Sequence, residues 1–305
     1  MNLTNPIYTN EAKARAHLEA LRWPDGPVCP HCGVIGNAVR LAGESTRPGL
    51  FKCRDCRQPF SVTVGTVFER SKIPLHKWLL AAHLMASSKK GFSAHQLHRA
   101  IKVTYKTAWF MMHRLREAMR DTDTGLLGGP GSSDIVEADE VYLGKAKGQG
   151  KGAHYNSKQK VVALVERKGR VRAFHVPTVN VHTVKEILHG QVAKSARLMT
   201  DSAGLYTKIG KTFASHETVN HLRGEYARGD VTTNTVEGYF GILQRGLRGI
   251  YQHVSPEHLH RYVNEFSFRY NYRSSRGIED HERAALLLKG ISGKRLTYRR
   301  SDATA

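Results

Sequence analysis

The stretch Ile135-Val-Glu-Ala-Asp-Glu-Val-Tyr-Leu143 places three carboxylates among residues typical of a buried strand. Valine, isoleucine and tyrosine favour a pleated, half-buried surface, so the stretch predicts a strand within a sheet. Carboxylates inside such a strand are costly unless they bind a metal or are paired. Glu137, Asp139 and Glu140 therefore make this strand the first candidate for a functional site.

The segments after this strand predict the rest of an α/β sheet. Val161–Glu166 and Val171–Val176 flank the turn Arg167-Lys-Gly-Arg170, which predicts a β-hairpin. A helix capped by Asn180 then leads to a strand that ends at Asp201. A second acid thus lies at a strand end, after the first crossover helix.

A third acid, Glu237, lies in a helical segment, Asn234–Tyr251. The apolar residues at its start recur at intervals of four and three, so one face is expected to be buried, with Glu237 at its edge. Two interpretations remain open at this point. Asn234 and Glu237 form a capping box, or Glu237 is a metal ligand. The apolar positions are Val236, Phe240, Leu243 and Leu247.

All four cysteines of the chain lie in two C-x2-C pairs, Cys29 with Cys32 and Cys53 with Cys56, with 20 residues between the pairs. This spacing favours a four-thiolate zinc site over disulfides or a redox pair. Four thiolates leave no open coordination position, so the zinc is expected to be structural. His31 is interpreted as a turn residue.

Two short helices joined by a three-residue break predict a helix-turn-helix. Ser93-Ala-His-Gln96 has the form of a capping box, and Thr104 can cap the second helix. Tyr105, Lys106 and Thr107 at the start of that helix are the expected DNA contacts. Ordinary helical bundles show the same periodicity, and the net charge supplies much of the argument for DNA.

The composition favours a polyanionic partner. The 305 residues include 47 Lys+Arg against 26 Asp+Glu, a formal net charge of +21. Such a charge attracts double-stranded DNA and makes binding salt dependent. Hydrophobic content of 40% excludes a wholly disordered basic tail. No run of about 18 apolar residues predicts a membrane span, and the start lacks a signal peptide, so a cytoplasmic, nucleoid-associated location is expected.

Three motifs resemble the DDE transposases of bacterial insertion sequences, more narrowly the zinc-ribbon-containing group related to eukaryotic Merlin elements. They are Asp139-Glu-Val-Tyr-Leu-Gly-Lys145, Thr200-Asp-Ser202, and Asn234-Thr-Val-Glu-Gly-Tyr-Phe240 with His253-Val-Ser-Pro256. The resemblance extends from the cysteine ribbon to Phe268-Arg-Tyr-Asn271. It implies a ribonuclease H-like catalytic domain with a mixed sheet.

The resemblance also implies catalytic roles for Asp139, Asp201 and Glu237, which would hold two Mg²⁺ or Mn²⁺ ions. The implied reaction hydrolyses phosphodiester bonds at the ends of an insertion sequence to free 3′-OH groups. These hydroxyls then join to target DNA, and a homo-oligomer on the DNA is expected. Some relatives use Asn as the third residue, so Asn234 competes with Glu237.

One position departs from the pattern of many relatives. They carry Lys one heptad after the last acid, whereas this chain has Gln244. We expect Arg245 or Arg248 to supply the phosphate contact. The Gly/Lys-rich loop 144–160, with Lys145 and Lys147, is also expected to follow a phosphate backbone.

The expected fold class is α+β with several domains. A helix and four-cysteine zinc ribbon occupy 1–70, a helix-turn-helix-like domain 71–124 and a Gly/Pro/Ser-rich linker 125–133. The catalytic domain, with a C-terminal helix and a basic tail, occupies 134–305.

Two other functions compete with transposition. A non-enzymatic zinc-ribbon DNA-binding regulator would explain the first 120 residues but not an acid in a buried strand. A tyrosine recombinase would use His258-Leu-His-Arg261 and Tyr270. The short gap between these residues and the lack of a suitable upstream Arg argue against it.

Overall fold

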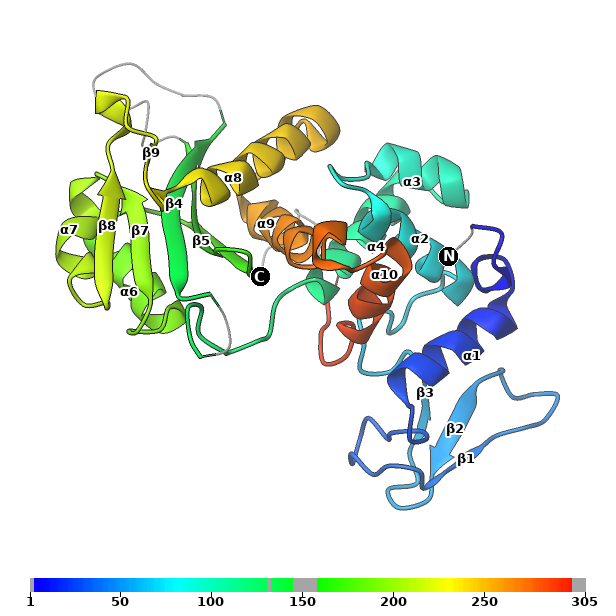
Figure 1. The fold of residues 1–305 in the computed structure, drawn as a ribbon. Coiled ribbons are helices and arrows are strands. Elements are labelled where there is room, and N and C mark those ends of the chain that lie inside the picture. Colours follow the sequence, from blue (N-terminus) through cyan, green and yellow to red (C-terminus); the bar gives the residue numbers. More distant parts are fainter. Residues whose placement is uncertain (1–2, 131–132, 145–157, 298–305) are drawn as a thin grey trace, which may run out of the picture. The chain divides into compact units, whose positions relative to one another are not determined.

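The structure is a computed structural model that describes residues 3–130, 133–144 and 158–297 (Figure 1). The chain forms two compact units. Unit 1 contains Met1–Arg120 and Arg273–Ala305, and unit 2 contains Asp121–Tyr272. The α+β class expected from the sequence is confirmed. In the described ranges, no helix is long and apolar enough to cross a membrane.

Unit 1 contains the cysteine ribbon, an antiparallel sheet of order β1-β2-β3. Its strands are β1 (Ala38–Arg40), β2 (Leu50–Cys53) and β3 (Pro59–Ser61). Trp23 packs edge-on against Phe51 and Phe60, with ring centroids 5.5 and 5.8 Å apart. Because so small a sheet buries little apolar surface beyond these rings, the fold of the ribbon depends on this aromatic cluster and on the cysteines.

The helices of unit 1 begin where the sequence predicts them. They are α1 (Glu11–Arg22), α2 (Leu75–Ser87), α3 (Ala94–Ile101) and α4 (Tyr105–Ala118), preceded by the short η1 (Pro6–Tyr8). The predicted capping box is present, because Ser93 Oγ accepts from Gln96 N and Gln96 Oε1 accepts from Ser93 N. Thr104 Oγ1 accepts from Thr107 N at 3.2 Å, so the break between α3 and α4 has the expected cap.

A helix that the sequence analysis did not predict, α10 (Asp280–Lys289), completes unit 1. Leu287 and Leu288 are buried, and Arg283 Nη1 donates to the carbonyl of Ala86 in α2 at 3.0 Å. The sequence analysis grouped these residues with the catalytic domain. By packing they belong with the N-terminal helices, because they bury their apolar side chains there.

Unit 2 is built on a five-stranded sheet of order β6-β5-β4-β7-β8. β4, β5 and β6 pair antiparallel, whereas β7 and β8 add in parallel to β4. This mixed sheet is consistent with the ribonuclease H-like domain expected from the resemblance. Its strands are β4 (Ile135–Leu143), β5 (Gln159–Glu166), β6 (Val171–Val176), β7 (Arg197–Asp201) and β8 (Ser215–Val219).

Helices cover both faces of this sheet (Figure 1). On one face, α6 (Val181–Gln191) and α7 (Gly204–Gly210) pack on even-numbered residues of β4 such as Val136 and Ala138. On the other face lie α8 (Asn234–Gly246) and α9 (Pro256–Asn271). Side chains alternate along a strand, so the odd-numbered acids of β4 face α8.

The remaining segments of unit 2 are short. The chain between β8 and α8 forms η2 (His221–Arg223), β9 (Ala227–Arg228) and β10 (Val231–Thr232). After α8 the helix continues as a π-helical turn, η3 (Leu247–Tyr251), and η4 (Ser274–Arg276) follows α9. The predicted burial of one face of α8 is confirmed, since Val236, Phe240 and Leu243 are all buried.

Candidate active site and zinc site

The register of β4 and β7 aligns two of the predicted site residues. The parallel pairing matches Ile135 with Arg197 and Glu137 with Met199. If this register is extended by two residues, Asp139 lies level with Asp201 at the end of β7. Aligned residues of a parallel pair point to the same face, so both carboxylates belong to the face that α8 covers.

Asp139 is in a strongly anionic environment. Burial raises the pKa of its carboxyl to about 7, and the charges of Glu140, Asp201 and Glu237 add to this shift. A hydrogen bond from Glu140 N to Asp139 Oδ1, 2.7 Å long, partly opposes it. The three predicted acids are therefore close enough to influence one another electrostatically.

Glu237 lies in the first turn of α8, and its side chain is 42% exposed. Thr233 Oγ1 donates to Glu237 Oε1 at 2.9 Å, and His221 Nε2 lies 3.4 Å from the same oxygen. Asn234 N donates to Thr232 Oγ1 instead of to Glu237. The capping-box interpretation was therefore wrong, and the cap residue is Thr233, not Asn234.

The start of α8 is held by Glu137, a residue that the sequence marked only as unusual. Glu137 is fully buried, and its Oε2 accepts from Thr235 N at 2.8 Å and from Val236 N at 3.0 Å. Thr235 Oγ1 donates to Glu137 Oε1 at 2.7 Å. A carboxylate on two unpaired amides also complements the positive end of the helix dipole.

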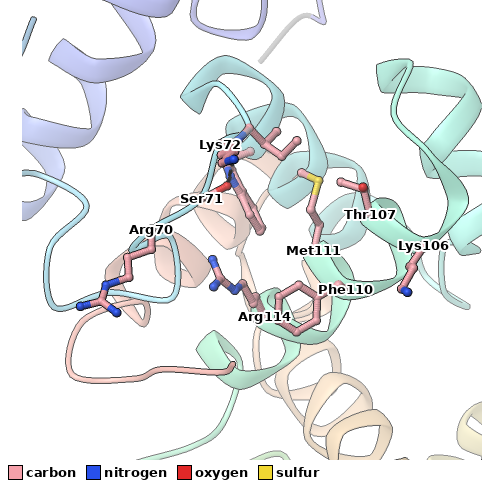
Figure 2. Close-up of a pocket in the computed structure, with 10 residues that line it drawn as sticks. Arg70, Ser71, Lys72, Lys106, Thr107, Phe110, Met111 and Arg114 are labelled. Atoms are coloured by element: carbon pink, nitrogen blue, oxygen red, sulfur yellow. Dashed lines mark hydrogen bonds between the residues drawn. The ribbon is translucent and has the colours of Figure 1, made fainter. Parts of the chain in front are cut away.

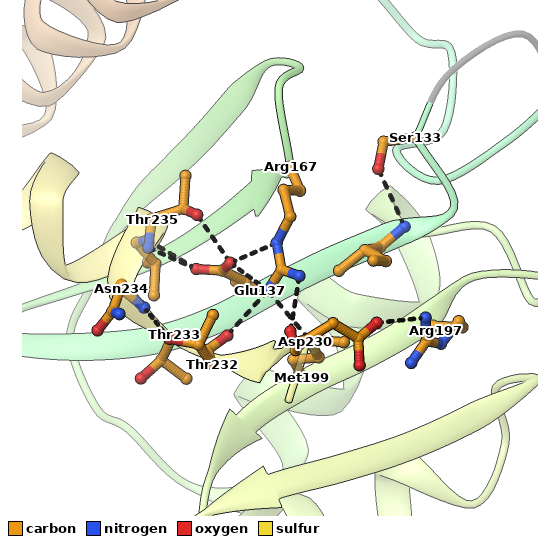
Figure 3. Close-up of polar contacts among 12 residues, drawn as sticks. Ser133, Glu137, Arg167, Arg197, Met199, Asp230, Thr232, Thr233, Asn234 and Thr235 are labelled. Atoms are coloured by element: carbon orange, nitrogen blue, oxygen red, sulfur yellow. Dashed lines mark hydrogen bonds and ion pairs between the residues drawn. The ribbon is translucent and has the colours of Figure 1, made fainter. Parts of the chain in front are cut away.

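Arg167 completes this network from the turn between β5 and β6 (Figure 3). Its Nε and Nη2 lie 3.0 and 2.8 Å from Glu137 Oε1, and Nη1 donates to the carbonyl of Asp230 at 2.7 Å. Nη2 also lies 3.2 Å from the carbonyl of Thr232. The strand, the hairpin turn and the chain entering α8 are thus joined at one point.

Glu140 faces the opposite side of the sheet from Asp139. Tyr206 of α7 donates its hydroxyl to Glu140 Oε2 at 2.7 Å. Burial raises the pKa of the Glu140 carboxyl, and the charge of Asp201 adds to this effect. Glu140 therefore borders the acidic cluster from the α7 side.

The acids of this cluster suit a hard divalent cation, since carboxylate oxygens are the ligands that Mg²⁺ and Mn²⁺ prefer. Burial, and to a smaller extent repulsion by the neighbouring carboxylates, raises the pKa of Asp139, and a bound cation would stabilise its charged form against both. Among the described residues, however, only the four cysteines have their ligand atoms gathered into a metal-binding group. The three carboxylates thus share a region of the structure without being as closely assembled.

The zinc site is the closely assembled one. The four Sγ atoms lie within 4.8 Å of one another, and none is in a disulfide. The two pairs form equivalent turns, because Cys29 N donates to Val34 O and Cys53 N to Gln58 O. Burial opposes ionisation of Cys29, but amides of Cys32 and His31 bring its pKa down to about 7. These thiols therefore fit a structural zinc ion.

The predicted DNA contacts fall in different places. Tyr105 and Lys106 are exposed at the start of α4 and Thr107 is half-buried, while Arg245 and Arg248 are exposed on α8 and η3. Gln244 is half-buried. Lys145 and Lys147 lie outside the described residues.

Sequence reasoning missed the roles of Arg167, which it placed only in a turn, and of His221. The presence of Glu137 in a buried strand indicated that a partner such as Arg167 must exist, since a buried acid needs a hydrogen-bond or ion-pair partner.

Comparisons with known proteins agree with this architecture. The family model of the transposase zinc-ribbon domain matches residues 9–59, and that of the ISXO2-like transposase domain matches residues 131–271. A relative from Halobacterium salinarum, described as an uncharacterized protein in transposable element ISH50, is 29% identical over 279 residues. The alignment covers 86% of this chain and 91% of the relative. The chain therefore carries the two domains that these family models describe, a transposase zinc ribbon followed by an ISXO2-like transposase domain.

Proposed function

We propose that the chain cuts and joins DNA with Asp139, Asp201 and Glu237 as its catalytic acids. The observation that supports this proposal is the β4–β7 register, which pairs Glu137 with Met199 and, extended by two residues, would bring Asp139 level with Asp201 on the sheet face covered by α8, the helix of Glu237. The substrate would be the ends of an insertion sequence and then target DNA. The fold family supports this reaction class.

In this proposal Asp139, Asp201 and Glu237 would together hold two divalent ions. When bound, such a pair of ions stabilises the attacking and leaving oxygens of a phosphodiester. The hydrogen bond from Ala203 N to Asp201 Oδ1, 3.1 Å long, orients Asp201. Thr233 orients Glu237 in the same way. Hydrolysis frees a 3′-OH, which then attacks the target strand in line.

Basic side chains of α8 and η3 would position the DNA. Gln244 follows Glu237 by two helical turns and Arg248 by three, so both lie near the face of Glu237. Arg248 is exposed and cationic, which makes it a suitable replacement for the missing Lys. Arg245 lies further round the helix. Tyr105, Lys106 and Thr107 would contact the element ends, with a homo-oligomer assembling on DNA in the cytoplasm.

The alternative functions receive less support. A purely regulatory DNA-binding protein does not need the acidic cluster around Asp139. For a tyrosine recombinase, Tyr270 would have to attack DNA. Tyr270 instead packs in the core between the sheet and α8, edge-on to Tyr239 with ring centroids 5.7 Å apart.

Single substitutions of the acids test the proposal. Asp139→Asn, Asp201→Asn and Glu237→Gln should each lower Mg²⁺-dependent strand cleavage by roughly a thousandfold or more, because each removes a metal ligand. Binding to duplex DNA should change little. Cleavage of labelled DNA carrying the element ends gives the rate, and fluorescence anisotropy gives the affinity.

Glu186→Gln is the matched control, since Glu186 is an exposed acid of α6 in the same unit. It should cleave at the wild-type rate. Normal cleavage by the Asp139→Asn protein would refute the proposed metal site.

A further inference from the structure

A cavity of about 310 Å³ opens beside the start of α4 in unit 1 (Figure 2). Its apolar wall consists of Trp78 from α2 and Phe110 and Met111 from α4. Ser71 lies at its edge and accepts hydrogen bonds from Ile73 N and Trp78 Nε1, both 3.0 Å long. Since both bonds are accepted, the hydroxyl proton of Ser71 is available to an acceptor in the cavity.

The charged side chains that line this cavity are all cationic: Arg70, Lys72, Lys106 and Arg114. Glu69 precedes this lining segment along the chain. Its Oε2 accepts from Gly65 N at 3.0 Å, and its Oε1 lies 3.7 Å from Arg70 Nε. Arg70 is therefore partly neutralised, whereas Lys72 is exposed and has no carboxylate partner among the residues that the structure describes.

Among the cationic side chains that line the cavity, Arg114 is the one that a bound anion would stabilise most. Its guanidinium is half-buried over the ring of Phe110, and it donates to the carbonyls of Glu69 and Leu296, both at 3.2 Å. Both acceptors are uncharged, and within the described ranges Arg114 forms no ion pair. Burial lowers the pKa of Arg114 and the charge of Arg295 lowers it further, while the more distant Glu69 carboxylate offsets only part of this shift. A partly buried cation that no carboxylate contacts directly is costly, so an anion in the cavity would stabilise it.

We propose that this cavity binds a backbone phosphate of the DNA whose major groove receives α4. A phosphate oxygen can accept from guanidinium, ammonium and hydroxyl groups together, which is the donor set of Arg114, Lys72 and Ser71. Backbone contacts next to a recognition helix fix its register on the duplex. The inference rests on the proposed DNA partner but not on the metal site.

The salt dependence of DNA binding tests this site, because each phosphate contact adds about one unit to the slope of log affinity against log salt. The full chain is titrated with a fluorescent duplex of about 30 base pairs of arbitrary sequence, without Mg²⁺ or Mn²⁺, since backbone contacts do not depend on sequence. Lys72→Gln and Arg114→Gln should each reduce the slope by about one unit. At physiological salt each should weaken binding roughly three- to tenfold.

Lys13→Gln is the matched control, because Lys13 is exposed on α1 and does not line the cavity. Lys72→Gln is the deciding variant, because this side chain is exposed and forms no hydrogen bond or ion pair with the residues that the structure describes. Arg114→Gln adds evidence where its circular dichroism matches the wild type. A slope for Lys72→Gln equal to that of Lys13→Gln overturns the proposal.

Two further results distinguish a DNA phosphate contact in this cavity from the two alternatives, a chain that does not bind DNA and a cavity that binds free phosphate. A wild-type chain that fails to bind the duplex would overturn the proposed DNA partner itself, whatever the cavity does. Inorganic phosphate distinguishes a free anion from the DNA backbone. Stabilisation of the wild type against heat by millimolar phosphate, absent in Arg114→Gln and accompanied by unchanged DNA slopes, would assign the cavity to free phosphate and overturn the DNA contact.

Discussion

At the scale of single residues, Asp139 combines a structural cost with its proposed catalytic role. Its pKa in the folded chain is about 7, against 3.8 for an unperturbed group. Between these values the folded chain holds a proton that the unfolded chain has released. The contribution of Asp139 to stability therefore becomes less favourable as pH rises through this window.

Asp139→Asn should consequently stabilise the protein when no Mg²⁺ or Mn²⁺ is present. Asparagine keeps an oxygen for the hydrogen bond from Glu140 N but carries no charge. We expect the free energy of unfolding to rise by about 2 kcal/mol near pH 8 and to change little near pH 4. Urea unfolding followed by circular dichroism measures both values.

Divalent ions should reduce or reverse the stability difference between Asp139→Asn and the wild type. Mn²⁺ added near pH 8 should stabilise the wild type and leave Asp139→Asn unchanged, because the ion needs the carboxylate. If Asp139→Asn is no more stable than the wild type near pH 8 without divalent ions, burial of the Asp139 carboxylate does not destabilise the folded chain.

At the scale of elements, the start of α8 is positioned by Glu137, a residue too distant in the sequence for any local pattern to reveal the contact. The amides at its start bond to Glu137, 98 or 99 residues earlier in the chain. Caps made by neighbours in sequence, such as Ser93 with Gln96, could be predicted because all partners lie within one turn. The cap of α8 could not, so a capping box of Asn234 with Glu237 stayed open in the sequence, whereas Thr233 is the cap residue and Glu137 accepts the amide hydrogen bonds.

Glu137→Ala should loosen the first turn of α8. It leaves the half-buried Arg167 without its carboxylate and two amides without acceptors, at a cost of about 3 kcal/mol. Hydrogen exchange in peptides spanning 233–240 should accelerate, while peptides of α6 on the other sheet face keep their rates. Glu186→Ala, on exposed surface, should leave both regions unchanged. Unaltered exchange at the start of α8 in Glu137→Ala would show that another contact holds the helix.

The individual strands, by contrast, follow well from the sequence. The hairpin of β5 and β6 and the strand ending at Asp201 were each predicted from local apolar runs and turn residues. Their assembly into one mixed sheet came from the family resemblance. The distances among the acids depend on register and on side-chain rotamers, which no local pattern determines.

At the scale of the whole molecule, unit 1 combines segments that are far apart in the chain, since the described residues after Arg273 pack with those before Arg120. α10 escaped prediction because a ten-residue helix with three consecutive leucines has no clear apolar stripe. Its burial depends on packing against α2, α1 and α4, all of which lie far earlier in the chain. During synthesis, the helices of unit 1 therefore remain incomplete until unit 2 has been made.

Leu287→Ala should destabilise unit 1 specifically. Leu287 is fully buried in α10, so its truncation should cost about 3 kcal/mol. All three tryptophans of the chain, Trp23, Trp78 and Trp109, lie in unit 1, so their fluorescence follows the unfolding of this unit alone. Leu286→Ala is the control on the same helix, because Leu286 is only half-buried and should cost less.

The same variant links the chain end to DNA binding. If α10 supports α2 and α4, Leu287→Ala should weaken DNA binding at temperatures where its tryptophan signal shows partial unfolding, and bind normally below them. Mn²⁺ binding by the acids of unit 2 should persist throughout, because those residues fold around their own cores. An unchanged tryptophan transition in Leu287→Ala would mean that α10 contributes nothing to the stability of the unit it packs in.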